Sequence, residues 1–208
     1  MNLRQKHFID SHKCATLPAT LAMIAFYGAW ENPTAWVYLG LHGSYGLMWA
    51  LKSRFFGDPQ WEKPTTLAYG VQIWAALTLY WSAPWLITAY DVRAPGWLLG
   101  AAIVTWALGV FLHFTSDMQK HVHLRLARGS LLRDGLWARC RNPNYLGELL
   151  IYAGFGALAM HWLPLMWLAV MVVGLWLPNM RRKDASLARY PEFAAWRARS
   201  CLFIPYLL

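Results

Sequence analysis

The stretch PGWLLGAAIVTWALGVFLHF, residues 95–114, decides the fold class, because it contains no Asp, Glu, Lys or Arg. As a helix it would be about 30 Å long, which is the thickness of the hydrocarbon core of a bilayer. Five further segments are comparably apolar: Ala15–Trp30, Thr34–Leu51, Thr65–Tyr90, Pro143–Trp162 and Leu163–Pro178. The pattern predicts an all-α, polytopic membrane helix bundle with about six transmembrane helices.

Composition favours a membrane protein over a soluble or disordered one. Of the 208 residues, 58% are hydrophobic and only 14% are charged, whereas about a quarter of a typical soluble domain is charged. Disordered chains are poor in aromatic residues, but this chain contains 14 Trp. A net charge of +9 is compatible with nucleic-acid binding, but the apolar content opposes it. We therefore expect no nucleic-acid partner.

The positive charge instead predicts the orientation of the chain. With six spans, 18 of the 19 Lys and Arg residues fall on one side of the membrane, and only Arg93 falls on the other. Cytoplasmic loops are enriched in Lys and Arg. We expect an integral membrane protein with both termini in the cytoplasm. Its three cysteines, Cys14, Cys140 and Cys201, are far apart and form no CxxC pair, so a disulfide framework or structural zinc site is not expected.

Small residues recur at helical spacing in two places. Gly96 and Gly100 form a GxxxG pattern, and Gly40, Gly43 and Gly46 repeat every three residues. Such patterns favour close packing between helices. A smooth surface for a flat ligand is the alternative.

A polar stripe follows the fourth apolar segment. His113, Asp117 and His121 recur every four residues and therefore share one helical face. The stripe is compatible with the cytoplasmic end of a span, with a metal site, or with a cofactor site. The seven His of the chain are too few and too scattered for a di-iron hydroxylase, and we expect no metal.

The most informative motif is DGLWARCRNPNYLGE, residues 134–148, which runs from a basic loop into the fifth segment. Pro143, between two Asn residues, is typical of a helix start. Arg139 and Arg141 at that helix N-terminus suit an anionic ligand. Glu148 is the one acid inside an apolar segment, where an acid is costly unless it has a function.

The C-terminal segment is amphipathic. Leu187, Tyr190, Phe193 and Trp196 recur at steps of three residues. They predict a cytoplasmic helix that lies on the membrane surface or folds over residues 142–148 as a lid. In the lid arrangement, Arg181 and Arg182 would face the other arginine pair across a polyanionic ligand.

An ordered set of short motifs over about half of the chain, roughly Trp97–Leu208, resembles the steroid 5-alpha-reductase C-terminal domain family. The wider group includes sterol C14-reductases and isoprenylcysteine carboxyl methyltransferases. The motifs are Ser116-Asp117, Gly135-Leu136, Asn144-Tyr145-Leu146-Gly147-Glu148, Arg181-Arg182, Tyr190-Pro191 and Phe203-Ile204-Pro205-Tyr206. The methyltransferases typically have an apolar or small residue after the motif Gly and a Glu-Glu pair after the last span. Glu148 and Lys183-Asp184 stand there in this chain, which favours the reductase branch.

The resemblance implies one integral-membrane domain over residues 1–208, with N-terminal spans in 1–95 and a reductase-like, cofactor-binding half in 96–208. It implies NADPH as the cofactor, and Arg side chains suit its phosphates. The implied cofactor-binding residues are Asp117, Arg125, Arg141, Asn144, Tyr145, Glu148, Arg181, Arg182 and Tyr190. Steroid reductases have a His-Tyr pair in the second span that polarises the substrate carbonyl. The nearest equivalents here are His42 and Tyr45, which with Glu148 are the expected catalytic residues.

Three functions remain open on sequence alone. The first is a membrane-embedded, NADPH-dependent oxidoreductase of lipid metabolism that reduces an activated C=C bond in a steroid- or isoprenoid-like substrate. The second is an S-adenosylmethionine-dependent methyltransferase of the isoprenylcysteine or phospholipid type. The third is a non-enzymatic membrane scaffold. The expected partners are a lipophilic small molecule and membrane lipids.

Overall fold

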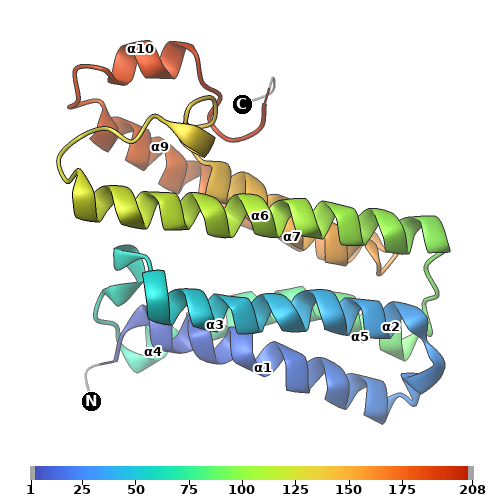
Figure 1. The fold of residues 1–208 in the computed structure, drawn as a ribbon. Coiled ribbons are helices and arrows are strands. Elements are labelled where there is room, and N and C mark those ends of the chain that lie inside the picture. The colour runs from blue at the N-terminus through green and yellow to red at the C-terminus, as the bar shows by residue number, and fades with distance from the viewer. Residues whose placement is uncertain (1–2, 206–208) are drawn as a thin grey trace.

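The computed structural model describes residues 3–205, and none of these residues forms a β-strand. Six helical stretches carry most of this part of the chain (Figure 1). They are α1 (Gln5–Phe26); α2 (Pro33–Tyr38) with η2 (Leu39–Gly43) and α3 (Ser44–Phe56); α4 (Leu67–Thr78) with η4 (Leu79–Trp81) and α5 (Ser82–Ala89); α6 (Gly96–Leu126); α7 (Pro143–Ala157); and α8 (Trp162–Met171) with η6 (Val172–Trp176) and α9 (Leu177–Leu187). Shorter helical turns are η1 (Ala29–Glu31), η3 (Pro59–Glu62), η5 (Gly135–Trp137) and α10 (Phe193–Ala198).

The all-helical fold class is confirmed, and each predicted apolar segment overlaps one of these stretches. The count of six spans is not confirmed. Among the described residues, two helices are long and apolar enough to cross a membrane, Gly96–Leu126 and Trp162–Leu187. The other stretches include polar residues or breaks. For example, α1 extends back over Lys6, Asp10 and Lys13.

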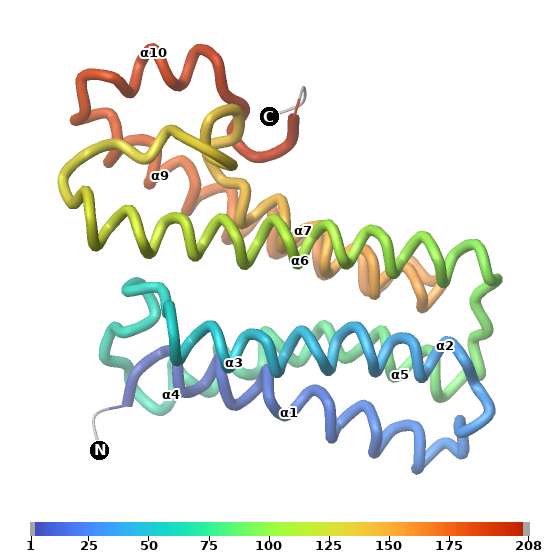
Figure 2. The backbone as a smooth tube through the Cα atoms, in the orientation of Figure 1, coloured from blue at the N-terminus to red at the C-terminus, as the bar shows by residue number. Residues whose placement is uncertain are grey.

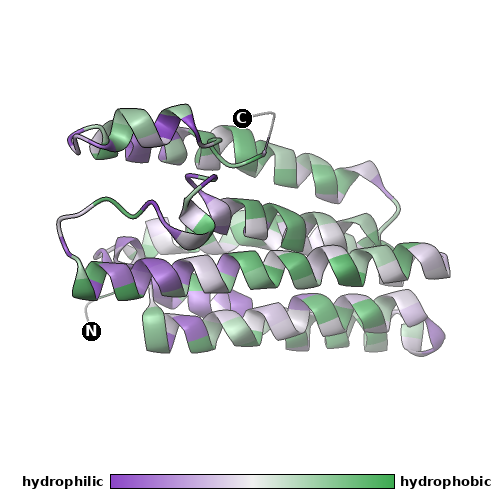
Figure 3. Cartoon of the chain, turned by 45° about the horizontal axis from the view of Figure 1, so that its top comes forward, coloured by the Kyte–Doolittle hydropathy of each residue, from purple (hydrophilic) through white to green (hydrophobic). Residues whose placement is uncertain are grey.

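Two layers of helices make up the molecule (Figure 2). α1 to α5 form one layer, α6 to α9 form the other, and the link at residues 90–95 joins them. Polar residues gather at the end of the helices where the N-terminus and the last turns of α6 lie (Figure 3). Polar residues are thus concentrated at one end of the bundle, and the rest of its length is mainly apolar.

Glycine allows α6 and α7 to pack closely against each other. A Cβ atom on Gly109 would lie 2.6 Å from the carbonyl oxygen of Gly147, and a Cβ on Gly147 would overlap the backbone nitrogen of His113. The glycine patterns predicted from sequence behave differently from one another. Gly46 packs directly on the backbone of α1, whereas Gly96 and Gly100 have open space around them, so the GxxxG pattern does not mediate packing among residues 3–205.

The C-terminal segment forms a cap on the loop before α7. α9 ends at Leu187, and Phe193 and Trp196 of α10 bury their rings against Leu131 and Trp137 of that loop. The Trp196 Nε1–H donates to the Trp137 carbonyl (2.9 Å). Phe193 and Trp196 therefore pack on the loop before α7, and Lys183 of α9 donates to the side-chain oxygen of Asn142 at the start of α7 (2.8 Å).

Candidate functional site

A cavity of about 520 Å³ lies between the two layers. Its size is in the range of small-molecule and cofactor sites. Its walls combine charged, hydroxyl-bearing and apolar side chains from both layers. The apolar wall is formed by Ile73, Ala76, Leu77, Met171, Leu175 and Trp176, and the polar wall by Lys13, Lys52, His113, Asp117, Asn144, Glu148 and Tyr152.

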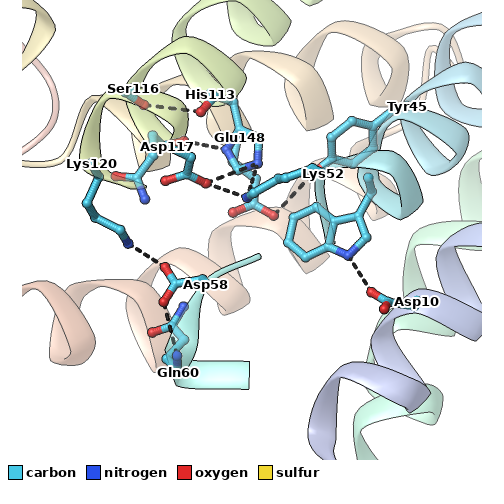
Figure 4. A network of polar contacts seen from close by, with 12 residues as sticks. Asp10, Tyr45, Lys52, Asp58, Gln60, His113, Ser116, Asp117, Lys120 and Glu148 are labelled. Atoms are coloured by element: carbon cyan, nitrogen blue, oxygen red, sulfur yellow. Dashed lines mark hydrogen bonds and ion pairs between the residues drawn. The ribbon is translucent and has the colours of Figure 1, made fainter. Parts of the chain in front are cut away.

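A buried ion pair stands at the centre of the polar wall. Lys52 of α3 pairs with the Oδ2 atom of Asp117 on α6, and each side chain is only 5% exposed. The His113 Nδ1–H donates to the Asn144 carbonyl (3.0 Å), which leaves Nε2 to accept from the Lys52 ammonium (3.2 Å). The Lys52 ammonium also lies 4.4 Å from the ring centroid of Trp49. One lysine therefore links α3 to α6 and, through the imidazole, to α7 (Figure 4).

A second cluster surrounds Glu148, one helical turn further along α7 than Asn144. Tyr45 of α3 donates its hydroxyl proton to Glu148 Oε1 (3.4 Å). The ammonium of Lys13 on α1 donates to the hydroxyl of Tyr152. Three helices, α1, α3 and α7, thus place two tyrosines, a lysine and an acid together, and such groups can exchange protons with a ligand.

Two buried acceptors in the cavity wall lack a partner. These are Oδ1 of Asp117 and Oδ1 of Asn144. An unpaired buried acceptor costs about 1–3 kcal/mol, so each favours a ligand that brings an N–H or O–H donor. No group of three or more His, Cys, Asp or Glu residues in the described part of the chain could hold a metal ion.

The loop between α3 and α4 closes the outer end of the cavity. Asp58 pairs with Lys120 of α6, and Glu62 accepts from Arg4 (2.5 Å) and Lys6 (2.6 Å). Hydrogen bonds from Lys6 and Arg4 lower the pKa of Glu62 below its ordinary value. These tethers hold Gln60 and Trp61 in the cavity wall.

The structure brings together five of the expected cofactor-binding residues. Asp117, Asn144, Tyr145, Glu148 and Arg182 all line the cavity. The Arg182 guanidinium donates to Asn179 (2.6 Å), which also lines it.

The remaining expected arginines lie elsewhere. Arg125 lines a separate depression on the other side of Asp58, and Arg181 is exposed. Arg141 is buried and pairs with Asp184 (3.0 Å), and it also donates to the Ser200 carbonyl (2.5 Å). Arg141 therefore holds the C-terminal segment against the start of α7 and does not face the cavity.

Three expected tyrosine and histidine positions also lie outside the cavity wall. Tyr190 packs against the Leu131–Trp196 cluster. His42 is buried in the π-helical turn η2, where it contacts the Tyr38 hydroxyl (2.7 Å) and stacks on Phe155. Tyr45 is fully buried behind Glu148.

Tyr152 and two lysines, Lys13 and Lys52, line the polar wall but were not predicted from the sequence. Both lysines were counted as cations of cytoplasmic loops, but both lie inside helices and are buried. The signal is that each directly flanks an apolar segment, Lys13 before Cys14-Ala15 and Lys52 after Leu51.

No curated protein and no solved structure matches the chain. The profile of a family described as "Protein of unknown function (DUF1295)" matches residues 48–183, a range that includes Lys52, Asp117 and Glu148 and extends over more than half of the chain. The chain therefore belongs to the DUF1295 family, which includes steroid 5-alpha-reductase-like membrane proteins.

Proposed function

We propose that this protein is a membrane-embedded, NADPH-dependent reductase of an activated C=C bond in a lipophilic, steroid- or isoprenoid-like substrate. The observation that carries the proposal is one cavity with two chemically different walls. One wall holds acids, lysines and tyrosine hydroxyls, and the other holds aliphatic and aromatic side chains. A flat hydrocarbon fits the second wall while its reacting end meets the first.

The donor set of the cavity fits NADPH. The unpaired oxygens of Asp117 and Asn144 are acceptors for the N–H groups of a carboxamide. Lys63 and Arg182 lie in the cavity wall and suit phosphate groups, because Arg and Lys bind phosphate through charge-assisted hydrogen bonds. When bound, NADPH would supply the hydride.

The protein's own residues orient the substrate and exclude water. Ile73 and Leu77 of α4 and Met171 and Leu175 of the α8–η6 stretch face the cavity from opposite layers. Burying a ring system between them contributes about 25 cal/mol per Å² of apolar area. Within this proposal the polar end of the bundle faces the cytoplasm, because the Lys and Arg residues gather there.

Calorimetry with NADPH on the purified, detergent-solubilised protein tests the proposal. We expect saturable binding that weakens tenfold or more in Arg182→Gln, since a hydrogen bond to a charged group contributes about 1.5–3 kcal/mol. Arg125→Gln is the matched control, because Arg125 lies outside the cavity, and it should bind NADPH like the wild type. Absence of binding at millimolar NADPH would overturn the proposal.

A methyltransferase is the second candidate, favoured by the aromatic side chains of the cavity. Trp49, Trp61, Tyr80 and Trp176 line it, and aromatic faces attract cations such as the sulfonium of S-adenosylmethionine. Calorimetry with S-adenosylhomocysteine distinguishes the two. Binding of this molecule without binding of NADPH would favour the methyltransferase over the reductase.

A further inference from the structure

We propose that Cys140 and Cys201 form a dithiol site, which a small anionic disulfide oxidises to a reversible intramolecular disulfide bond. The site lies where the C-terminal segment meets the loop before α7. It is independent of the proposed reductase function, because neither cysteine lines the cavity between the layers. The two residues are far apart in the sequence and form no CxxC pair, so only the fold brings them together.

The backbone holds the two cysteines side by side. They form an isolated parallel β-bridge, in which the Cys201 amide donates to the Arg139 carbonyl (3.0 Å) and the Arg141 amide donates to the Cys201 carbonyl (3.0 Å). Paired residues on neighbouring extended segments are about 4.8 Å apart, and natural disulfides join Cα atoms about 4.4–6.8 Å apart. A bond between the two sulfurs therefore requires rotation of the side chains and no movement of the backbone.

Hydrogen bonds on both sides of the bridge fix its register. The Asn142 side chain donates to the Leu202 carbonyl (2.9 Å), and the Arg141 guanidinium donates to the Ser200 carbonyl (2.5 Å). Two groups that the fold holds next to each other react as though each were highly concentrated around the other. The bridge therefore favours a bond within the chain over a lasting bond to a small thiol.

The two thiols are held only weakly in their present positions. The Cys140 Sγ–H donates to the Phe203 carbonyl (3.5 Å), and the Cys201 Sγ–H donates to the Arg139 carbonyl (3.3 Å). An S–H group is a weak donor, so both bonds are lost at little cost when the sulfurs turn toward each other.

The different exposure of the two thiols sets the order of reaction. Cys201 is partly exposed, whereas Cys140 is buried. Burial, followed by the neighbouring Cys201 side chain, raises the pKa of the Cys140 thiol above its ordinary value. Because the thiolate is the nucleophile, Cys201 attacks the incoming disulfide, and Cys140 completes the bond from inside.

Positive charge around Cys201 favours an anionic reactant. Arg139, whose carbonyl accepts from the Cys201 thiol, is exposed, and so are Arg197 and Arg199 just before Cys201 in the sequence. A cluster of like charges raises the rate at which molecules of opposite charge arrive. Glutathione disulfide, which carries several carboxylates, has the chemistry that this surface attracts.

The exchange balances with one molecule of glutathione disulfide. The Cys201 thiolate attacks one glutathione sulfur, forms a mixed disulfide and releases the first glutathione thiolate. The Cys140 sulfur then attacks the Cys201 sulfur, forms the protein disulfide and displaces the second glutathione thiolate. The two protons of the cysteines end on the two glutathione thiolates. The protein thus loses two electrons and two protons, and the reactant leaves as two thiols.

Oxidation fixes the cap on the start of α7. The new bond closes a loop that contains α7, α8, α9 and α10. A cross-link restricts the unfolded chain and so stabilises the folded protein. In a chain of this size a bond without strain should raise the Tm by about 4–16 °C. Reduction returns the cap to noncovalent contacts alone.

Peptide mapping by mass spectrometry on the purified, detergent-solubilised protein tests the site. After incubation with glutathione disulfide and quenching with N-ethylmaleimide, a peptide pair linked through Cys140 and Cys201 should appear, and dithiothreitol should remove it. Cys140→Ser should stop at a mixed disulfide between Cys201 and glutathione. Cys14→Ser is the matched control, since Cys14 is exposed on α1 in the other layer, and it should form the link like the wild type.

Thermal unfolding of the oxidised and the reduced wild type supplies the second measurement. Absence of the linked peptides, even with all of the glutathione present as disulfide, would overturn the proposal. A linked protein whose Tm does not rise would also overturn it, because the bond would then require a rearrangement of the cap. Both measurements use the wild-type chain, so they decide the matter even if Cys140→Ser fails to fold.

Discussion

The ion pair between Lys52 and Asp117 offers the sharpest test of the structure. Replacing Lys52 with Met removes the charge partner of Asp117 and leaves the carboxylate in a site where only 5% of its side chain is exposed. Its second oxygen already lacks a partner. Breaking a buried pair from one side costs about 3–5 kcal/mol. For a chain of this size that corresponds to a fall in Tm of roughly 6–20 °C.

The double variant Lys52→Met/Asp117→Leu gives the opposite expectation. Replacing both members of a buried pair with apolar residues of similar volume is often close to neutral, so the second substitution should restore most of the lost stability. Thermal unfolding followed by circular dichroism in one detergent measures both. Lys63→Met is the control, because Lys63 is exposed and surface changes stay within about 0.5 kcal/mol. The buried pair would be refuted if Lys52→Met were as stable as the wild type. It would also be refuted if the double variant lost as much stability as Lys52→Met and Asp117→Leu lose separately when added together.

Three further predictions follow from the packing. Gly147→Ala should destabilise the protein by about 1–3 kcal/mol, because the added Cβ meets the α6 backbone. Gly100 has open space around it, so Gly100→Ala should leave the Tm unchanged or raise it. Burial raises the pKa of the Cys140 thiol to about 12. Since the thiolate is the reactive form, mass spectrometry should find Cys140 alkylated more slowly by N-ethylmaleimide than the partly exposed Cys201. Arg141→Met should lower the Tm by leaving the partly buried Asp184 unpaired. Calorimetry should nevertheless show an unchanged Kd for NADPH, since Arg141 does not line the cavity; a weakened Kd would show that it serves the ligand.

Local sequence patterns were sufficient for the helices. Charge-free runs and the Pro143 start of α7 each act through the backbone or the nearest turns. They therefore predict helices before any partner is known. The number of membrane spans is harder to predict from sequence, because α1 carries polar residues. The partners of these residues come from other helices.

The candidate site was predicted in part. Glu148 was identified because an acid in an apolar helix is conspicuous along the chain, whereas Asp117 and Asn144 were identified through the polar stripe and the family resemblance. Lys13 and Lys52 were not, because a lysine next to an apolar segment resembles the cation that ends a membrane span. Whether such a side chain points to solvent or into the bundle depends on residues 65 or more positions away, such as Asp117 for Lys52.

The glycines and Arg141 show the same difference between a local property, which the sequence predicts, and a distant partner, which it does not. A GxxxG pattern specifies a smooth surface but not what lies against it, and Gly100 faces open space while Gly109 contacts α7. An arginine in a loop specifies a charge but not its partner. Arg141 uses its charge on the chain itself.

The cap at the start of α7 has a consequence for biosynthesis. Asn142 donates to the carbonyl of Leu202, which follows it by 60 positions along the chain. The Cys201 amide likewise bonds to the Arg139 carbonyl. During translation, α7 therefore emerges well before the segment that completes its N-terminal end. A nascent chain should present this end to solvent or to the insertion machinery until Leu202 is synthesised, so a chain arrested before that point should remain sensitive to protease at residues 139–142 while the finished protein resists cleavage there.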